Sequence, residues 1–260
     1  MAAPVLSLRG VGKRFLSRGR LVHALQDIDL DVEPGHFLGV VGPSGCGKST
    51  LLNIIVGLMP PSEGEIRFAD RPVVGLNPEI GYVTQQDNLL PWRTLRKNVQ
   101  LALELRREPQ DDWDRRTAAL IRKVGLAGFE DHYPHELSGG MRQRANIIRT
   151  LIYNPTVIII DEPFGPLDAQ TRLALQSQLL ALWQEERKTV IFITHDLAEA
   201  IALSDRVVLM TARPGRIKRV VSITIPRPRD VYHMHDAAHF REIYDLLWED
   251  LREEVVEAMA

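Results

Sequence analysis

The segment 42–49 places the tightest constraint on what this chain can fold into. It reads Gly-Pro-Ser-Gly-Cys-Gly-Lys-Ser and fits the pattern G-x-x-x-x-G-K-[ST]. Its glycines let successive backbone N–H groups face one small volume, and a helix that starts there adds the positive end of its dipole. The segment 36–41 predicts a short buried strand before it, and the segment 51–58 predicts a helix after it. The chain therefore predicts a phosphate-binding loop, or P-loop, in an α/β core.

Two side chains of the P-loop supply the chemistry that the pattern implies. Lys48 brings a mobile positive charge for the β and γ phosphates, and Ser49 brings a hydroxyl ligand for Mg²⁺. The alternative is a glycine-rich turn with a stray lysine, and the strand and helix expected on the correct sides argue against it. The binding residues expected here are Gly42, Pro43, Ser44, Gly45, Cys46, Gly47, Lys48, Ser49 and Thr50.

Composition limits the class of protein and its compartment. The chain has 260 residues, 45% of them hydrophobic, which suits one large domain or two small ones. Its net charge of -2 argues against a general nucleic-acid binder but leaves a local basic patch open. The one cysteine, Cys46, permits no internal disulfide and suits a reducing cytosol.

Residues 1–4 lack signal-peptide features, and no apolar run reaches the length of about 18 residues that spans a bilayer. We therefore expect another chain to bring this one to any membrane.

Strand and helix patterns alternate on both sides of a helical stretch. Strand patterns occur at 5–8, 25–32, 63–68 and 80–84. Helical patterns occur at 94–107 and 111–124, where strand signals vanish. We therefore expect an α/β core formed by residues 1–87 and 154–225, with a helical subdomain inserted at about 88–153.

Two side chains beside the early strands have more than one interpretation. Phe15 has the ring to stack on a nucleobase, but its spacing alone favours a core or surface ring. Gln85, at the end of the segment 80–84, has the reach for a metal ion or a water, although such a glutamine is more often a solvated loop residue.

A second potential anion site begins at Ser138. This serine is a natural N-cap for the helical pattern that follows. Gly139 and Gly140 leave backbone N–H groups uncovered at the start of that helix. An ordinary helix cap is the alternative, and it becomes less attractive because the chain already holds one anion site.

Two apolar strands end in polar side chains. The segment 157–160 is wholly apolar and leads into Asp161 and Glu162, as in a buried parallel strand. Ligands collect at the carboxyl ends of such strands. We therefore predict that Asp161 holds Mg²⁺ and that Glu162 polarises the attacking water. His195 follows another apolar strand, 189–194, so it stands out although a lone histidine is usually structural.

The last part of the chain predicts the closure of the core and an extension. We expect a strand at 207–210, a hairpin turn at 215–217 and a core-closing segment at 222–225. The segment 226–229 alternates proline and arginine and predicts a linker. Residues 231–260 predict a helical tail, with an apolar stripe that covers the core or a partner subunit. The stripe consists of Phe240, Ile243, Leu247, Leu251 and Val255.

Taken together, these segments resemble the ATP-binding subunit of ABC transporters over nearly the whole chain. Six motifs occur in the order of that family, and the order makes the resemblance specific although no single motif does. They are Walker A at 42–49, the Q-loop Gln85, the signature 137–140, Walker B at 157–161 followed by Glu162, the D-loop at 167–168, and the switch His195. Phe15 falls where the family has an adenine-stacking aromatic residue. The resemblance therefore favours a stacking ring over the core or surface ring that spacing alone favours.

The resemblance implies a fold, an activity and a set of roles. The fold is α/β, a P-loop NTPase (RecA-like) core with an N-terminal antiparallel β subdomain and an inserted α-helical subdomain. The nucleotide-binding domain would cover 1–230 and the tail 231–260. The activity is ATP hydrolysis coupled to transport. The implied catalytic residues are Glu162, His195 and Gln85, the implied Mg²⁺ ligands are Ser49, Gln85 and Asp161, and the implied ATP contacts beyond the P-loop are Phe15, Ser138, Gly139, Gly140 and Asp168.

The resemblance also implies partners. Two copies would pair head to tail, with each ATP held between the P-loop of one copy and Ser138, Gly139 and Gly140 of the other. Transmembrane permease subunits and, indirectly, an external substrate-binding protein would complete the system at the cytoplasmic face of the cell membrane. No nucleic acid is expected.

The segments 89–92 and 212–217 look like the nitrate, sulfonate and taurine importer group. Other solutes, export, and a soluble ABC ATPase of DNA repair or translation remain alternatives. Soluble ABC ATPases usually carry long coiled-coil insertions or two cassettes, whereas P-loop kinases and GTPases lack the signature and His195. Thr84 and the pair Gly165-Pro166 depart from the usual family pattern, and the second departure leaves the behaviour of the D-loop open.

Overall fold

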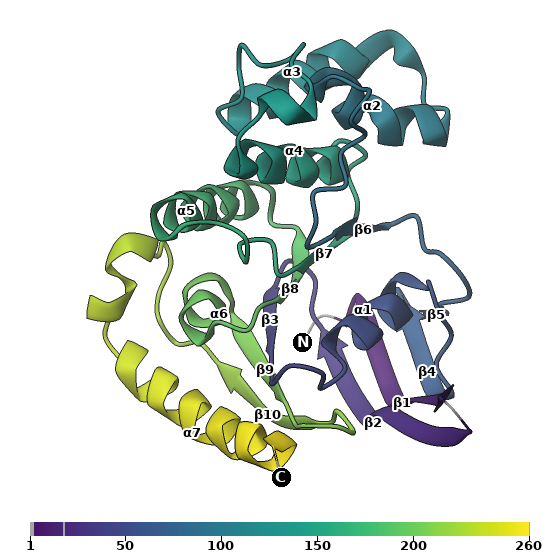
Figure 1. Ribbon diagram of the computed structural model, residues 1–260, viewed down its shortest axis with the longest axis vertical. Coiled ribbons are helices and arrows are strands. Elements are labelled where there is room, and N and C mark those ends of the chain that lie inside the picture. Colours follow the sequence, from purple (N-terminus) through teal and green to yellow (C-terminus); the bar gives the residue numbers. More distant parts are fainter. Residues whose placement is uncertain (1–2, 18, 260) are drawn as a thin grey trace.

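The structure, a computed structural model, describes residues 3–17 and 19–259 of the chain. Residues 1 and 2, on which the signal-peptide prediction partly rests, lie outside these ranges, as does the last residue of the predicted tail. Within the described ranges, the strands form two sheets with helices packed around them (Figure 1). None of the helices in this part of the chain has the length and apolar character that crossing a lipid bilayer requires.

The larger sheet has six strands in the order β10-β9-β3-β8-β7-β6. They are β3 (Phe37–Val41), β6 (Ile80–Val83), β7 (Val157–Asp161), β8 (Thr189–Ile193), β9 (Arg206–Met210) and β10 (Ile217–Ser222). All are parallel to their neighbours except the edge strand β10, which runs antiparallel to β9. Every residue of β3 and β8 is buried, because α5, α6 and α7 pack on one face of the sheet, and α1 and the smaller sheet pack on the other.

The position predicted for the end of this sheet is wrong. The last strand begins at Ile217, which the prediction placed in the turn, and it ends at Ser222, where the core-closing segment was expected to begin. β10 lies at an edge and has no buried residue in its six positions, so its sequence carries no clear alternation. Ile223 and Ile225 nevertheless fill the core from the irregular segment beyond it.

The smaller sheet is antiparallel, with the strand order β2-β1-β4-β5. Its strands are β1 (Leu6–Ser17), β2 (Arg20–Val32), β4 (Glu63–Phe68) and β5 (Arg71–Pro72). β1 and β2 are longer than predicted, because their far ends are exposed and no buried residues mark the strands there. Phe15 therefore belongs to a strand and not to a loop.

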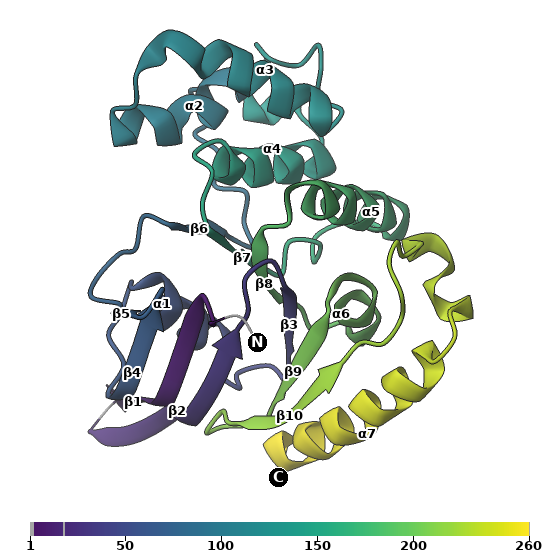
Figure 2. The same cartoon turned by 180° about the vertical axis from the view of Figure 1, so that it is seen from behind.

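Helices gather in two places around the larger sheet (Figures 1 and 2). The helices are α1 (Lys48–Val56), α2 (Leu95–Arg106), α3 (Trp113–Lys123), α4 (Gly139–Leu151), α5 (Ala169–Glu186), α6 (Leu197–Leu203) and α7 (Phe240–Met259), with 3-10 turns η1 (Gln110–Asp112), η2 (Pro134–Glu136) and η3 (Val231–Asp236). α2, α3 and α4 form a separate layer that shares its own apolar cluster, which includes Leu95, Val99, Ile121 and Ile148. Sequence reasoning missed α6, since all of its seven residues except one are buried and it shows no polar face.

The tail folds back on its own chain. α7 runs beside α6 and the end of the sheet at β9 and β10 (Figure 2). Phe240, Ile243, Leu247 and Leu251 are buried in the main apolar cluster, with Val255 packed against it. The stripe predicted on this helix thus covers the core of its own chain. The segment 226–229 has no helix or strand, as predicted, but Arg229 is buried and donates to backbone carbonyls at the end of α6.

Candidate functional site

The P-loop joins β3 to α1, as the sequence predicts. Gly47 precedes the first residue of α1 and has a φ of 106°, a conformation that favours glycine. A Cβ atom added to Gly47 would lie 2.7 Å from Leu25 Cδ2 and 2.9 Å from the Ala24 carbonyl oxygen. The loop therefore rests against β2 with no room for a side chain at this position.

Lys48 holds its positive charge in the centre of the P-loop. Its Nζ donates to the carbonyl oxygens of Gly42 at 2.8 Å and Pro43 at 3.1 Å, and the side chain is buried. Burial raises the pKa of the Cys46 thiol, while the charge of Lys48, 3.8 Å away, opposes the rise. The lysine and the start of α1 make this an anion-binding place. Of the other predicted residues, Ser44, Gly45 and Ser49 are exposed and Thr50 is half-buried.

The three residues predicted to be catalytic meet at one edge of the larger sheet. β6, β7 and β8 are neighbours, so their carboxyl ends lie side by side. Glu162 Oε2 lies 3.2 Å from His195 Nδ1 and 3.5 Å from Gln85 Nε2. Glu162 has a φ of 41°, a left-handed conformation that is uncommon outside glycine and often occurs at functional sites.

Asp161 lies beside this group at the end of β7. The Tyr82 hydroxyl donates to its Oδ2 at 3.2 Å. Burial raises the pKa of Asp161, while the Tyr82 hydrogen bond and the charge of Lys48 oppose the rise. Burial, together with the charge of Asp161, raises the pKa of Tyr82, which keeps that hydroxyl protonated as a donor. Sequence reasoning missed Tyr82, because only strand pairing shows that it faces Asp161.

Ser49, Gln85 and Asp161 offer a hydroxyl, an amide and one carboxylate as oxygen donors. Magnesium prefers such oxygen ligands, and it is usually held by one or two carboxylates together with the phosphates of a substrate. Within residues 3–17 and 19–259, no group of three or more His, Cys, Asp or Glu could hold a metal ion alone. This donor set therefore fits a cation that arrives with a phosphate ligand.

His195 is positioned by a buried polar network. Thr194 Oγ1 accepts from the backbone N–H of Asp196 at 3.0 Å and donates to Glu199 Oε2 at 2.6 Å. Gln176 of α5 donates to the other oxygen of Glu199 at 3.0 Å. Thr194 and Asp196, the two neighbours of His195 in the chain, are therefore both held by hydrogen bonds of this network. The sequence alone did not indicate Glu199 or Gln176.

The predicted signature residues lie at the start of α4. Ser138 Oγ accepts from the Met141 backbone N–H at 3.3 Å, as an N-cap does. Ser138 and Gly139 are exposed, whereas Gly140 is buried, and a Cβ added there would lie 2.7 Å from Thr171 Cγ2 of α5. Asp168 caps α5 by accepting from the backbone N–H groups of Gln170 and Thr171.

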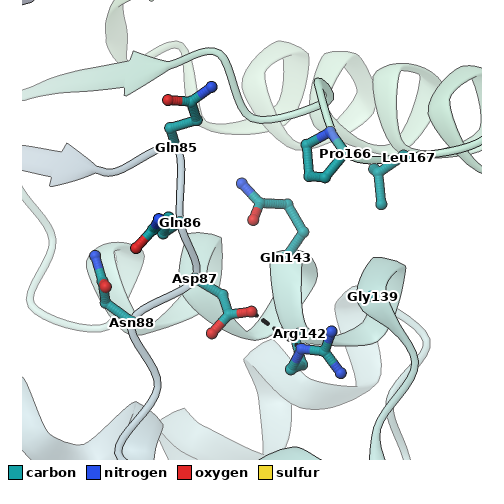
Figure 3. A pocket seen from close by; sticks show the side chains of 9 residues that line it. All are labelled: Gln85, Gln86, Asp87, Asn88, Gly139, Arg142, Gln143, Pro166 and Leu167. Carbon is teal, nitrogen blue, oxygen red and sulfur yellow. Dashed lines mark hydrogen bonds and ion pairs between the residues drawn. The ribbon is translucent and has the colours of Figure 1, made fainter.

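A cavity of about 640 Å³ brings the Q-loop, signature and D-loop segments together. Gln143 extends into it between Gln85 and Pro166 (Figure 3). Its lining residues are Gln85, Gln86, Asp87, Asn88, Gly139, Arg142, Gln143, Pro166 and Leu167. None of these residues comes from the P-loop.

One face of α4 anchors the chain that follows Gln85. Arg142 Nε donates to Asp87 Oδ2 at 3.0 Å, and Asn146 Nδ2 donates to the Thr84 carbonyl oxygen at 3.0 Å. Arg149 donates to the carbonyl oxygen of Asp87 at 2.7 Å. Arg142, Asn146 and Arg149 are spaced by four and three residues, so they share a face. That spacing is the signal in the sequence that could have revealed this anchor.

Phe15 lies on β1 in the smaller sheet. Its ring is 38% exposed, and Lys13 Nζ lies 5.4 Å from the ring centroid. Lys13 pairs with Leu25 across the strands, and Leu25 is the residue that touches Gly47. The β1–β2 pair that carries Phe15 therefore contacts the P-loop at Gly47.

Comparison with known proteins agrees with this arrangement. Residues 25–165 match the profile of the ABC transporter family. The aliphatic sulfonates import ATP-binding protein SsuB of Bacillus cereus is 44% identical over 86% of this chain and 88% of its own length. The nitrate import ATP-binding protein NrtC of Synechococcus elongatus is 45% identical over 86% of this chain, which corresponds to 34% of that protein.

A solved structure extends the comparison to three dimensions. The ATP-binding cassette MJ0796, a dimer in a post-hydrolysis state bound to ADP and Pi, matches with a TM-score of 0.74 and 32% identity over 84% of this chain and 98% of its own. The fold and the site define an ATP-binding, ATP-hydrolysing subunit. The chain belongs to the ABC transporter family.

Proposed function

We propose that this chain is the ATPase subunit of an importer for a small solute of the sulfonate, taurine or nitrate type. Two relatives at 44% and 45% identity are named for the import of aliphatic sulfonates and of nitrate. The segments 89–92 and 212–217 resemble the same importer group. We place the subunit at the cytoplasmic face of a cell membrane, with permease subunits as partners and an external binding protein as an indirect one.

The main support for the proposal is that Glu162 contacts both His195 and Gln85 at one edge of the sheet. Asp161 lies at the same edge, close enough for the charge of Lys48 to lower its pKa against the effect of burial. In our proposal Lys48 binds the β and γ phosphates, and the P-loop N–H groups surround them. Glu162 orients or deprotonates the attacking water, and His195 contacts the γ-phosphate. Their shared contact through one carboxylate oxygen supports a common task.

We further propose that Ser49, Asp161 and Gln85 hold Mg²⁺ when nucleotide binds. Held there, the ion would supply positive charge that offsets the negative charge of the β and γ phosphates. Asp161, as the one carboxylate of this set, supplies its negative charge to the site, and Tyr82 fixes its orientation by donating to Oδ2.

Two copies complete the site in our proposal. Ser138 and Gly139 are exposed at the N-terminal end of α4, where an anion from another molecule has access. We propose that these residues, with Gly140 and Asp168, contact ATP held by the P-loop of a second copy, while Phe15 stacks on its adenine. The dimeric form of MJ0796 supports this arrangement. We also propose that the nucleotide-binding domain covers 1–230, with its helical subdomain at about 88–153, and that the tail covers 231–260.

The test is the effect of ATP on the oligomeric state of the Glu162→Gln variant. This change keeps the shape of the side chain and removes the carboxylate, so ATP should bind without being hydrolysed and should hold the dimer closed. Size exclusion with light scattering should show a shift from monomer to dimer on addition of ATP. Adding Ser138→Arg to the same variant should abolish the shift, since the larger side chain blocks the second copy. A Glu162→Gln protein that stays monomeric and hydrolyses ATP at the wild-type rate would contradict the proposal.

A further inference from the structure

The loop 211–216, which joins β9 to β10, packs against the P-loop and is called the supporting loop below. A Cβ atom added to Gly215 would lie 2.0 Å from the carbonyl oxygen of Cys46, so the two backbones are in direct contact. Arg213 Nη2 donates to the carbonyl oxygen of Gly45 at 3.4 Å. Two consecutive peptide units of the P-loop therefore rest on this supporting loop.

The supporting loop is held from two sides. On one side Gly215 exchanges backbone hydrogen bonds with β2, donating to Ala24 and accepting from Gln26 at 3.0 Å each. On the other side the backbone N–H of Ala212 donates to Glu254 Oε2 at 2.7 Å. Glu254 lies near the end of α7, so the tail helix reaches the P-loop through one hydrogen bond and one loop.

Glu254 is a buried carboxylate that nothing in the proposed hydrolysis uses. Its side chain is 7% exposed, and its Oε1 lies 2.8 Å from Lys218 Nζ of β10. A buried charge costs free energy unless it is paired, and Lys218 supplies that pairing. The neighbouring Glu253 approaches the same lysine at 2.7 Å, but its side chain is 68% exposed and faces solvent. The two glutamates thus share a cation but differ in burial.

We propose that Glu254 is a positioning residue for the P-loop. By accepting from Ala212 it holds the supporting loop against Gly45 and Cys46, and this support keeps the P-loop N–H groups directed at one volume. The inference rests on the proposed function, since the property it concerns is the affinity for ATP. It gives the tail helix a part in nucleotide binding although α7 lies outside the site.

The test compares four forms of the full chain by calorimetric titration with ATP and Mg²⁺. They are the wild type, Glu254→Leu, Glu254→Gln and, as the matched control, Glu253→Gln. Both changes at 254 remove the charge and the pairing with Lys218, which keeps its contact with Glu253, but only glutamine retains an oxygen that accepts from Ala212. We expect Glu254→Leu to raise the Kd of ATP about five- to tenfold, which is less than the loss of a whole charged hydrogen bond, because Glu254 acts on the P-loop only through the supporting loop. Glu254→Gln and Glu253→Gln should stay within about twofold of the wild type.

Hydrolysis gives a second readout that a general loss of stability would not produce. The KM for ATP should rise in Glu254→Leu while kcat stays unchanged, because Glu162 and His195 keep their places. If Glu254→Leu does not fold, Glu254→Asp takes its place, since aspartate keeps the charge near Lys218 but is too short to reach Ala212.

The outcomes separate the inference from the proposed function. The inference would be overturned if folded Glu254→Leu, or Glu254→Asp in its place, bound ATP as tightly as the wild type. It would also be overturned if Glu254→Leu and Glu254→Gln lost the same amount of ATP affinity. Absence of ATP binding to the wild type, or unchanged binding in Lys48→Ala, would instead refute the proposed function.

Discussion

Glu199 shows how a single buried carboxyl group links the site to the stability of the fold. It accepts hydrogen bonds from Gln176 and from Thr194, the residue that precedes His195. Burial raises the pKa of Glu199, because the ionised form loses its water, while the Thr194 hydrogen bond and the charge of Arg172 oppose the rise. Ionisation of this group therefore works against folding.

The stability of the protein should consequently depend on pH through Glu199. The folded state holds this proton more tightly than the unfolded state, so the stabilisation is present below pH 4.5 and is lost as the pH rises through the folded-state pKa. Glu199→Gln cannot titrate, so the stability of the wild type relative to this variant should fall between pH 4.5 and neutrality. Urea unfolding of both proteins across this range measures the difference.

Glu249→Gln is the control, because this side chain is exposed on α7. Its stability difference from the wild type should stay flat over the same range. A difference between the wild type and Glu199→Gln that does not change with pH would show that the carboxyl group titrates alike in both states.

At the scale of elements, the segment 226–229 fastens the tail to the core. Arg229 donates to the carbonyl oxygens of Ile201 at 2.9 Å, Ser204 at 2.6 Å and Ile225 at 3.0 Å. Burial lowers the pKa of Arg229 to about 10, which still leaves it charged at neutral pH. Arg227 stacks 4.1 Å from the Trp183 ring centroid and pairs with Asp205. These contacts make the segment 226–229 a clasp that holds the chain before the tail against α5 and the end of α6.

Replacement of Arg229 by leucine should cost about 2–4 kcal/mol of unfolding free energy, since several buried carbonyl oxygens would lose their donor. Arg252→Leu is the matched control, because this arginine is exposed on α7 and its loss should cost less than about 0.5 kcal/mol. Denaturant unfolding monitored by circular dichroism compares the two variants. An equal, small effect of both changes would mean that the clasp does not stabilise the chain.

Elements differed in how well their sequence revealed them. β7 and β8 are continuous apolar runs, so their position and the polar residues after them were predictable. The capping residue Ser138 also marked the start of α4 correctly. β10 and α6 were not predictable, because an exposed edge strand and a wholly buried helix both lack the two-sided pattern on which such predictions depend.

At the scale of the whole molecule, the fold class and the meeting of Glu162 with His195 could be predicted, because the ends of parallel strands share one edge. The supporting residues could not be predicted. Tyr82, Glu199 and Glu254 owe their roles to contacts between segments that are distant in the chain, with Asp161, Gln176 and Ala212 respectively. Sequence spacing carries no information about such contacts without the packing of the elements.

The state of Cys46 has a consequence for experiments on the molecule as a whole. It is the one cysteine of the chain, it is 1% exposed, and burial raises the pKa of its thiol. Maleimides react with the thiolate, so this residue should stay unmodified at neutral pH. A cysteine placed at Val74, which is 90% exposed, should react at least about a hundredfold faster. Mass spectrometry after brief treatment distinguishes the two sites.

If only the introduced cysteine reacts, fluorescent or spin labels can be attached at chosen positions without replacing the native Cys46. Pairs of such labels, one on the helical layer and one on the smaller sheet, would then report any change in the distance between these two parts during a turnover cycle. Rapid modification of the wild type would rule out this use and would mean that the P-loop opens to solvent far more often than its packing implies.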